Sequence, residues 1–163
     1  MTTIMKFIAK KSINRLLMMF MLSGLSLISV SALSFAATPK IGESYGGGIV
    51  FYVDNTGQHG LIVAKTDMTG HSTDKEEGVL NWYDAKVAAN SFVDGYSDWF
   101  LPNKEQLHQL YVNKNIVGGI VDTYYWSSSE SDVNNAWAEY FLNGKQVAGS
   151  RSNGSCVRAV RAF

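Results

Sequence analysis

The sequence lacks several features that define whole classes of protein. It contains one cysteine and two prolines in 163 residues, and its fifteen glycines form no G-X-Y repeat. A single cysteine excludes an intramolecular disulfide framework, and the missing repeat excludes a collagen triple helix. Charged residues make up only 17% of the chain while apolar residues make up 46%, which excludes an intrinsically disordered chain. One globular domain held together by a hydrophobic core is therefore predicted.

The N-terminal part has the pattern of a secretory signal. A basic segment ends at Arg15 and is followed by an apolar run over residues 16–30. The run is shorter than the roughly 20 residues that span a bilayer. Ser34 and Ala36 are small residues at the places that a signal peptidase requires. We predict a signal peptide over residues 1–36 that is cleaved after Ala36, with an uncleaved N-terminal anchor as the alternative.

Cleavage would leave a single domain, residues 37–163, without a transmembrane span and with a negative charge. Four basic residues leave with the signal, so ten Lys and Arg remain against fourteen Asp and Glu, a net charge of −4. A generally basic surface is thereby excluded, and nucleic acid is not a predicted partner. The expected location is the periplasm or the extracellular face of the cell.

Hydrophobic patterns predict strands and helices in separate parts of the chain. Residues 46–54 and 60–65 flank a turn and predict a hairpin. Asn81 with Asp84, and Asn103 with Gln106, are typical of the capped starts of two short helices. Four strands are expected afterwards, over residues 123–129, 136–142, 145–148 and 156–163. This order predicts an α+β fold with two short helices on a mainly antiparallel β-sheet, and argues against a parallel nucleotide-binding sheet.

Five segments occur in a characteristic order: GGGIVFYVD at 46–54, DWFLPNKEQL at 98–107, YWSSS at 125–129, AW at 136–137 and CVRAVR at 156–161. Together they resemble the C-terminal domain family of the Legionella collagen-like adhesins. The resemblance implies a C-type-lectin-like fold, in which the chain ends near where it began. It also implies a non-catalytic adhesion module that recognises glycans such as sulphated polysaccharides and forms homo-oligomers. A structural or oligomerisation module of an envelope assembly is the alternative.

Three basic residues are candidates for contact with a sulphated glycan. Lys145 follows an Asn-Gly turn, and Arg151 and Arg158 come later in the chain. Together they could form a local basic patch on an otherwise acidic domain. The alternative is that they are ordinary solubilising cations of the surface.

The richest cluster of side-chain oxygens lies between two predicted strands, over residues 127–135. It contains Glu130, Asp132, Asn134 and Asn135. Carboxylate and amide oxygens are the ligands that calcium prefers. However, neither calcium-binding triplet of the C-type lectins occurs, so no cofactor is predicted and a solvated loop is the favoured interpretation.

No catalytic centre is predicted. Three histidines are scattered without metal-ligand spacing: His59, His71 and His108. Cys156 is alone in a predicted strand, where a buried structural thiol is the commoner case. A hydrolase with a site built from residues 67–77 and 127–135 remains a third functional hypothesis.

Four further residues are predicted to have structural roles. Trp99, Trp126 and Trp137 lie beside predicted strand or helix ends and are expected in the core rather than at a sugar-binding surface. Arg158 and Arg161 stand three apart on one predicted strand and so point to opposite faces. We expect Arg161 to be partly buried and paired with a carboxylate, and Arg158 to be the more exposed of the two.

Overall fold

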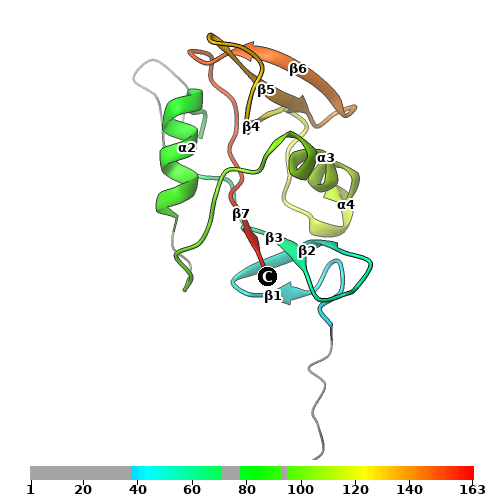
Figure 1. The fold of residues 1–163 in the computed structure, drawn as a ribbon. Helices are drawn as coiled ribbons and strands as arrows, with labels where there is room; N and C mark the ends of the chain where they lie inside the picture. Colours follow the sequence, from blue (N-terminus) through cyan, green and yellow to red (C-terminus); the bar gives the residue numbers. More distant parts are fainter. Residues whose placement is uncertain (1–37, 71–77, 93–94) are drawn as a thin grey trace, which may run out of the picture. The chain divides into compact units, whose positions relative to one another are not determined.

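The computed structural model describes residues 38–70, 78–92 and 95–163 (Figure 1). The predicted signal peptide, His71 and most of the loop 67–77 lie outside these residues, and what we expect of them stays a prediction. In the described part of the chain, no helix is both long enough and apolar enough to cross a membrane.

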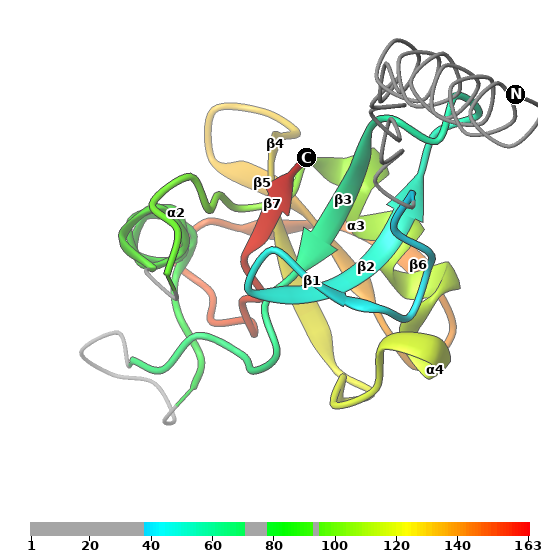
Figure 2. The ribbon, with the colours of Figure 1, turned by 90° about the horizontal axis from the view of Figure 1, so that it is seen from below.

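The described residues form two antiparallel sheets and three helices, which confirms the predicted α+β class. The first sheet has the order β1-β2-β3-β7, formed by Ser44–Tyr45, Gly48–Val53, Gly60–Val63 and Val160–Ala162. The second has the order β4-β5-β6, formed by Tyr124–Glu130, Asn135–Tyr140 and Lys145–Ser150. Because the last strand pairs with β3 in the first sheet, the chain ends beside the hairpin with which the domain begins (Figure 2).

The helices begin where the capping residues predict. Helix α2 covers Trp82–Ser91, and the Asn81 side chain accepts two backbone N–H groups of its first turn. Helix α3 covers Lys104–Val112 and starts with a complete capping box between Asn103 and Gln106. A third helix, α4, covers Lys114–Val117 and was not predicted, because four residues are too few to show a helical period.

The predicted strand over residues 156–163 is only partly a strand. Its last part is β7, whereas the residues before it run between the two sheets. Cys156 forms a single bridge to Tyr125 of β4, and Val160 at the start of β7 forms one to Phe100, which precedes α3. Val157 and Ala159 are fully buried there. This segment therefore has no solvent-facing side, and a strict alternation of inner and outer faces does not apply to it.

The core consists of two clusters on opposite faces of the first sheet. Val50 and Ile62 point into the cluster that α2 covers, together with Trp82 and Trp126. Phe51 and residues on α3 form the second cluster. Helix α3 thus lies against the hairpin and the second sheet at once, and this placement creates the groove described next.

Candidate functional site

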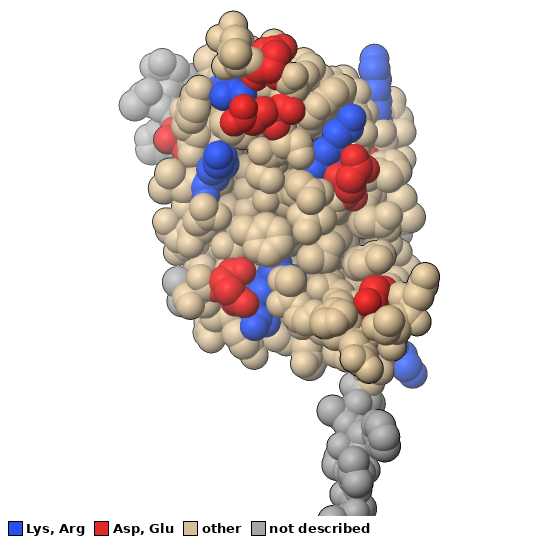
Figure 3. Space-filling view, viewed as in Figure 1, with Lys and Arg blue, Asp and Glu red and all other residues tan. Residues whose placement is uncertain are grey.

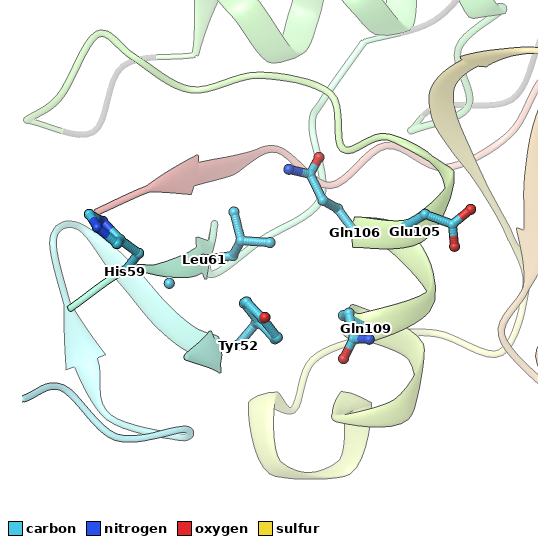
Figure 4. Close-up of a pocket in the computed structure, with 7 residues that line it drawn as sticks. Tyr52, His59, Leu61, Glu105, Gln106 and Gln109 are labelled. Atoms are coloured by element: carbon cyan, nitrogen blue, oxygen red, sulfur yellow. The ribbon is translucent and has the colours of Figure 1, made fainter. Parts of the chain in front are cut away.

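A groove of about 410 Å³ lies between the β2–β3 hairpin and helix α3 (Figure 4). It is lined by residues of the hairpin and of the first two turns of the helix: Tyr52, His59, Gly60, Leu61, Glu105, Gln106 and Gln109. Tyr52 and Leu61 stand on the hairpin side, across from Gln109 on the helix, while His59 lies at the end of the hairpin (Figure 4). The Glu105 carboxylate points away from Tyr52, at the far rim.

An irregularity in the hairpin aims Tyr52 into this groove. Val50 pairs with Ile62 and Tyr52 pairs with Leu61, so Phe51 is one extra residue in β2. Such a β-bulge turns neighbouring side chains away from strict alternation. As a result Phe51 is fully buried in the second core cluster, and Tyr52 packs against the same cluster while staying half-exposed.

Two further local features shape the groove. Gln106 belongs to the capping box: its side-chain oxygen accepts the Asn103 N–H at 2.8 Å, which leaves its amide NH₂ group available. Gly60 cannot be larger, because a Cβ there would lie 2.4 Å from the Phe163 ring and 2.4 Å from the carbonyl oxygen of Tyr52. The hairpin backbone can therefore run close to the C-terminus.

The lining combines an aromatic ring, an aliphatic side chain, an imidazole and two amides, with the Glu105 carboxylate at the rim. Among the described residues, no lysine or arginine lines the groove. An arrangement of this kind can pack against an apolar ligand face and exchange hydrogen bonds with hydroxyl or amide groups.

Arg158 does not belong to a surface patch, so the prediction of its exposure was wrong. Its side chain is 1% exposed, and its Nε donates to Asp67 Oδ1 at 2.5 Å. The same guanidinium donates to the carbonyl oxygens of Ala64, at 3.0 Å, and Gly119. Arg158 is buried because it lies on the segment that passes between the two sheets.

The Arg151 side chain is also largely buried. Its Nη2 lies 2.9 Å from Glu130 Oε2 and donates to the carbonyl oxygen of Asp132 at 2.6 Å. The guanidinium lies over the Trp82 ring, 4.5 Å from its centroid. Of the three proposed cations only Lys145 is exposed, and a binding role for it stays a prediction.

The Asp132 carboxylate of the oxygen-rich loop 127–135 is hydrogen-bonded within the loop. The Asp132 carboxylate accepts the backbone N–H groups of Asn134, at 2.8 Å, and Asn135, at 2.9 Å. It also accepts the Asn135 side-chain amide, and this hydrogen bond is the main reason why the pKa of Asp132 is lowered. With Glu130 bound to Arg151, these carboxylates do not converge on one point. Within the described ranges no group of three or more His, Cys, Asp or Glu side chains could hold a metal ion.

Arg161 confirms the expected pairing. It lies at the end of the first sheet, is partly buried, and its Nε donates to the Asp98 carboxylate. Its guanidinium also lies 3.8 Å from the centroid of the Tyr96 ring. The pair holds the segment before α3 against β7.

The tryptophans divide into two groups. Trp99 and Trp126 are 2% and 1% exposed, which confirms that they belong to the core. Trp137 was predicted there too, but it is only half-buried, on the face of β5 that α3 partly covers. The Lys104 ammonium lies 3.5 Å from the centroid of the Trp137 ring, so this ring is covered by a cation of α3.

Sequence reasoning missed a buried carboxylate beside the same helix. Glu139 is fully buried, and its Oε1 lies 2.8 Å from Nδ1 of His108. Gln146 donates to the other carboxylate oxygen at 3.3 Å. An acidic residue in the apolar strand AWAEYF was the available signal, since a buried charge needs a partner.

Cys156 is half-buried beside the Asp67–Arg158 pair. Burial raises the pKa of its thiol to about 11, and the negative charge of Asp67 adds to this effect. Since the thiolate is the reactive form, this environment is typical of a structural cysteine.

Comparison with known families gives one match. The family model described as the Lcl C-terminal domain matches residues 58–161, which is more than half of the chain and includes every groove residue except Tyr52. No curated protein matches the chain. The matched domain is an adhesin module with no known catalytic activity. The chain therefore belongs to the Lcl C-terminal domain family, a module of the Legionella collagen-like adhesin.

Proposed function

We propose that this chain is an exported, non-catalytic adhesion module that binds carbohydrate at the cell envelope or surface. The observation that carries the proposal is the groove between the β2–β3 hairpin and α3. Its volume of about 410 Å³ falls in the range of small-ligand pockets, about 300–1,000 Å³. Export is supported by the predicted signal peptide and by membership of an adhesin family.

The composition of the groove favours binding over catalysis. The described lining residues include no serine, threonine, cysteine, lysine or aspartate, so only Tyr52, His59 and Glu105 could act as a nucleophile, an acid or a base. Besides Tyr52, the groove has two ionisable side chains, His59 and Glu105, and they lie at its opposite ends (Figure 4). A general acid and base must both reach the reacting atoms, and these two are not placed to do so.

Glycan-array binding tests this function. The protein purified after expression of the full chain is applied to neutral, acidic and sulphated glycans, at low and physiological salt, with and without calcium. Reproducible binding to at least one glycan class is expected. No binding to any class, by a protein that melts cooperatively, would contradict the proposal.

A self-associating structural module is a second candidate, favoured by exposed apolar side chains on the second sheet. Tyr124 is 41% exposed and stacks on Tyr140 with ring centroids 4.5 Å apart, and Leu142 beyond it is 56% exposed. Exposed apolar groups of this kind mark interaction surfaces when they are contiguous. Light scattering separates the two candidates, because a concentration-dependent oligomer without glycan binding would favour this one.

A further inference from the structure

We propose that the groove between the β2–β3 hairpin and α3 takes an uncharged sugar unit, stacked on Tyr52 and hydrogen-bonded to α3. This inference rests on the proposed carbohydrate binding and names the class of sugar and the residues that hold it. It differs from the sulphated polysaccharide that the family resemblance implied.

The hairpin supplies an apolar platform. Tyr52 and Leu61 are paired across β2 and β3, so their side chains lie next to each other. Both face the space between hairpin and helix (Figure 4). One face of a pyranose ring presents mainly C–H groups. Such a face packs on the ring of a tyrosine while the tyrosine hydroxyl stays in contact with water. The bulge at Phe51 is what leaves the Tyr52 ring available for this contact.

On the opposite wall, two uncharged amides of α3 can form hydrogen bonds with a ligand, while Glu105 lies at the rim. The side-chain amide of Gln109 forms no hydrogen bond with any described residue. The side-chain NH₂ group of Gln106 stays available after its oxygen has capped the helix. An amide donates through nitrogen and accepts through oxygen, which matches sugar hydroxyls that do both. His59 at the hairpin end offers the same pair of roles through its two ring nitrogens.

An anionic sugar would find no cation here. No Lys or Arg lines the groove, and Glu105 places a negative charge at its rim. The nearest lysine in sequence, Lys104, has its ammonium over the Trp137 ring. A sulphate entering the groove would lose water without gaining a charged partner, which is unfavourable.

Elsewhere in the described residues the three arginines and Lys114 are held in ion pairs, whereas four exposed lysines form no salt bridge with a described residue: Lys40, Lys65, Lys86 and Lys145. Arg151, Arg158 and Arg161 are paired with Glu130, Asp67 and Asp98, and Lys114 is paired with Asp122. On the face shown in Figure 3, some basic side chains lie beside acidic ones and others stand apart from them. The electrostatics therefore favour a neutral ligand at the groove itself, where the described lining residues include an acidic side chain and no lysine or arginine.

The test compares neutral and sulphated ligands on four proteins. Neutral hexose and N-acetylhexosamine oligosaccharides of two to six units, and sulphated chains of similar length, are titrated into the wild type and into Tyr52→Ala, Tyr52→Phe and Tyr124→Ala. Tyr124 is the matched control, since it is an exposed tyrosine of the second sheet. Thermal melting of each variant verifies that it is folded.

We expect at least one neutral oligosaccharide to bind with an affinity that salt does not change. Tyr52→Ala should weaken this binding about tenfold, while Tyr52→Phe and Tyr124→Ala stay within about twofold of wild type. If Tyr52→Ala fails to fold, Gln109→Ala takes its place, because Gln109 is exposed and its loss removes a hydrogen bond without opening the core.

The other outcomes separate the inference from the proposed function. Binding of sulphated chains alone, lost at physiological salt and unchanged by Tyr52→Ala, would overturn the inference and keep carbohydrate binding. Neutral binding that neither Tyr52→Ala nor Gln109→Ala weakens would place the site elsewhere and also overturn the inference. No binding at all would overturn the proposed function itself.

Discussion

Replacing Arg158 with alanine is expected to destabilise the domain by about 3 kcal/mol. Its guanidinium is 1% exposed, pairs with Asp67 and also donates to two backbone carbonyl oxygens. Removing one partner of a buried ion pair costs about 3–5 kcal/mol. The lower end of this energy range applies because the Asp67 side chain is 25% exposed and still accepts a hydrogen bond from the Tyr125 hydroxyl at 2.9 Å.

Urea unfolding followed by tryptophan fluorescence measures this loss directly. Trp126 is 1% exposed in the core, so its emission should report global unfolding. A loss of about 3 kcal/mol corresponds to a melting temperature lower by about 10 °C in a domain of this size. Lys145→Ala is the matched control, since Lys145 is exposed and its loss should cost less than about 0.5 kcal/mol.

The reasoning is refuted if Arg158→Ala unfolds within about 0.5 kcal/mol of wild type. Such a result would mean that the guanidinium is hydrated in solution rather than held between the two sheets. A variant that is equally stable but binds sulphated chains less tightly would restore Arg158 as a surface cation. We expect neither result, because the carbonyl oxygen of Ala64, which Arg158 satisfies, belongs to a fully buried residue and accepts from no other donor among the described residues.

Three other predictions follow from single contacts. Hydrogen bonding, chiefly from Asn135, lowers the pKa of Asp132 below its ordinary value of 3.8. The ionised Asp132 carboxylate therefore stabilises the fold above pH 3.8, and this stabilisation is lost as the pH falls through the lowered pKa. Asp132→Asn should therefore lose less stability than wild type in melts between about pH 5 and pH 2. His108→Ala removes a partner of the buried Glu139 carboxylate and should cost about 1–3 kcal/mol in urea unfolding; no measurable change would contradict the pairing. Burial raises the pKa of the Cys156 thiol from 9.0 to about 11, so its alkylation at pH 8 should be about 100-fold slower in the native protein than in urea. Equal rates would contradict its burial.

The family and the groove together suggest how such a module could adhere. The three arginines of the described residues are held in internal ion pairs, so they add little to a diffuse attraction to polyanions. Binding of an uncharged ligand in the groove would persist at physiological salt, where exposed charge pairs are weakened. The salt dependence of binding is thus the property that best separates the two modes.

Much of the secondary structure follows from local sequence. Asn103 and Gln106 specify the start of α3 because their side chains satisfy backbone groups only three residues away. The turn at Asn143 and Gly144 likewise connects β5 and β6, with Gly144 at φ 76°. Contacts of this range need no knowledge of the rest of the chain, so the α+β class and most element positions were predictable.

The candidate site was not predictable, because its residues are far apart in the chain. Tyr52 and Gln109 meet only when α3 lies against the hairpin, and no local pattern announces the extra residue at Phe51. A β-bulge depends on how two strands pair, which is a property of the sheet rather than of either segment. The sequence placed Tyr52 in a strand but could not tell which way its ring would face.

Tertiary structure also decided which charges reach solvent. The sequence alone determined the charge count of the domain, the position of most strands and the two helix caps at Asn81 and Asn103. It could not show that residues 156–159 pass between two sheets, where Arg158 becomes the partner of Asp67 although 90 residues separate them. Alternation along a strand assigns an inner and an outer face only when one face meets water. Here both faces meet protein, so burial and ion pairing were set by packing rather than by periodicity.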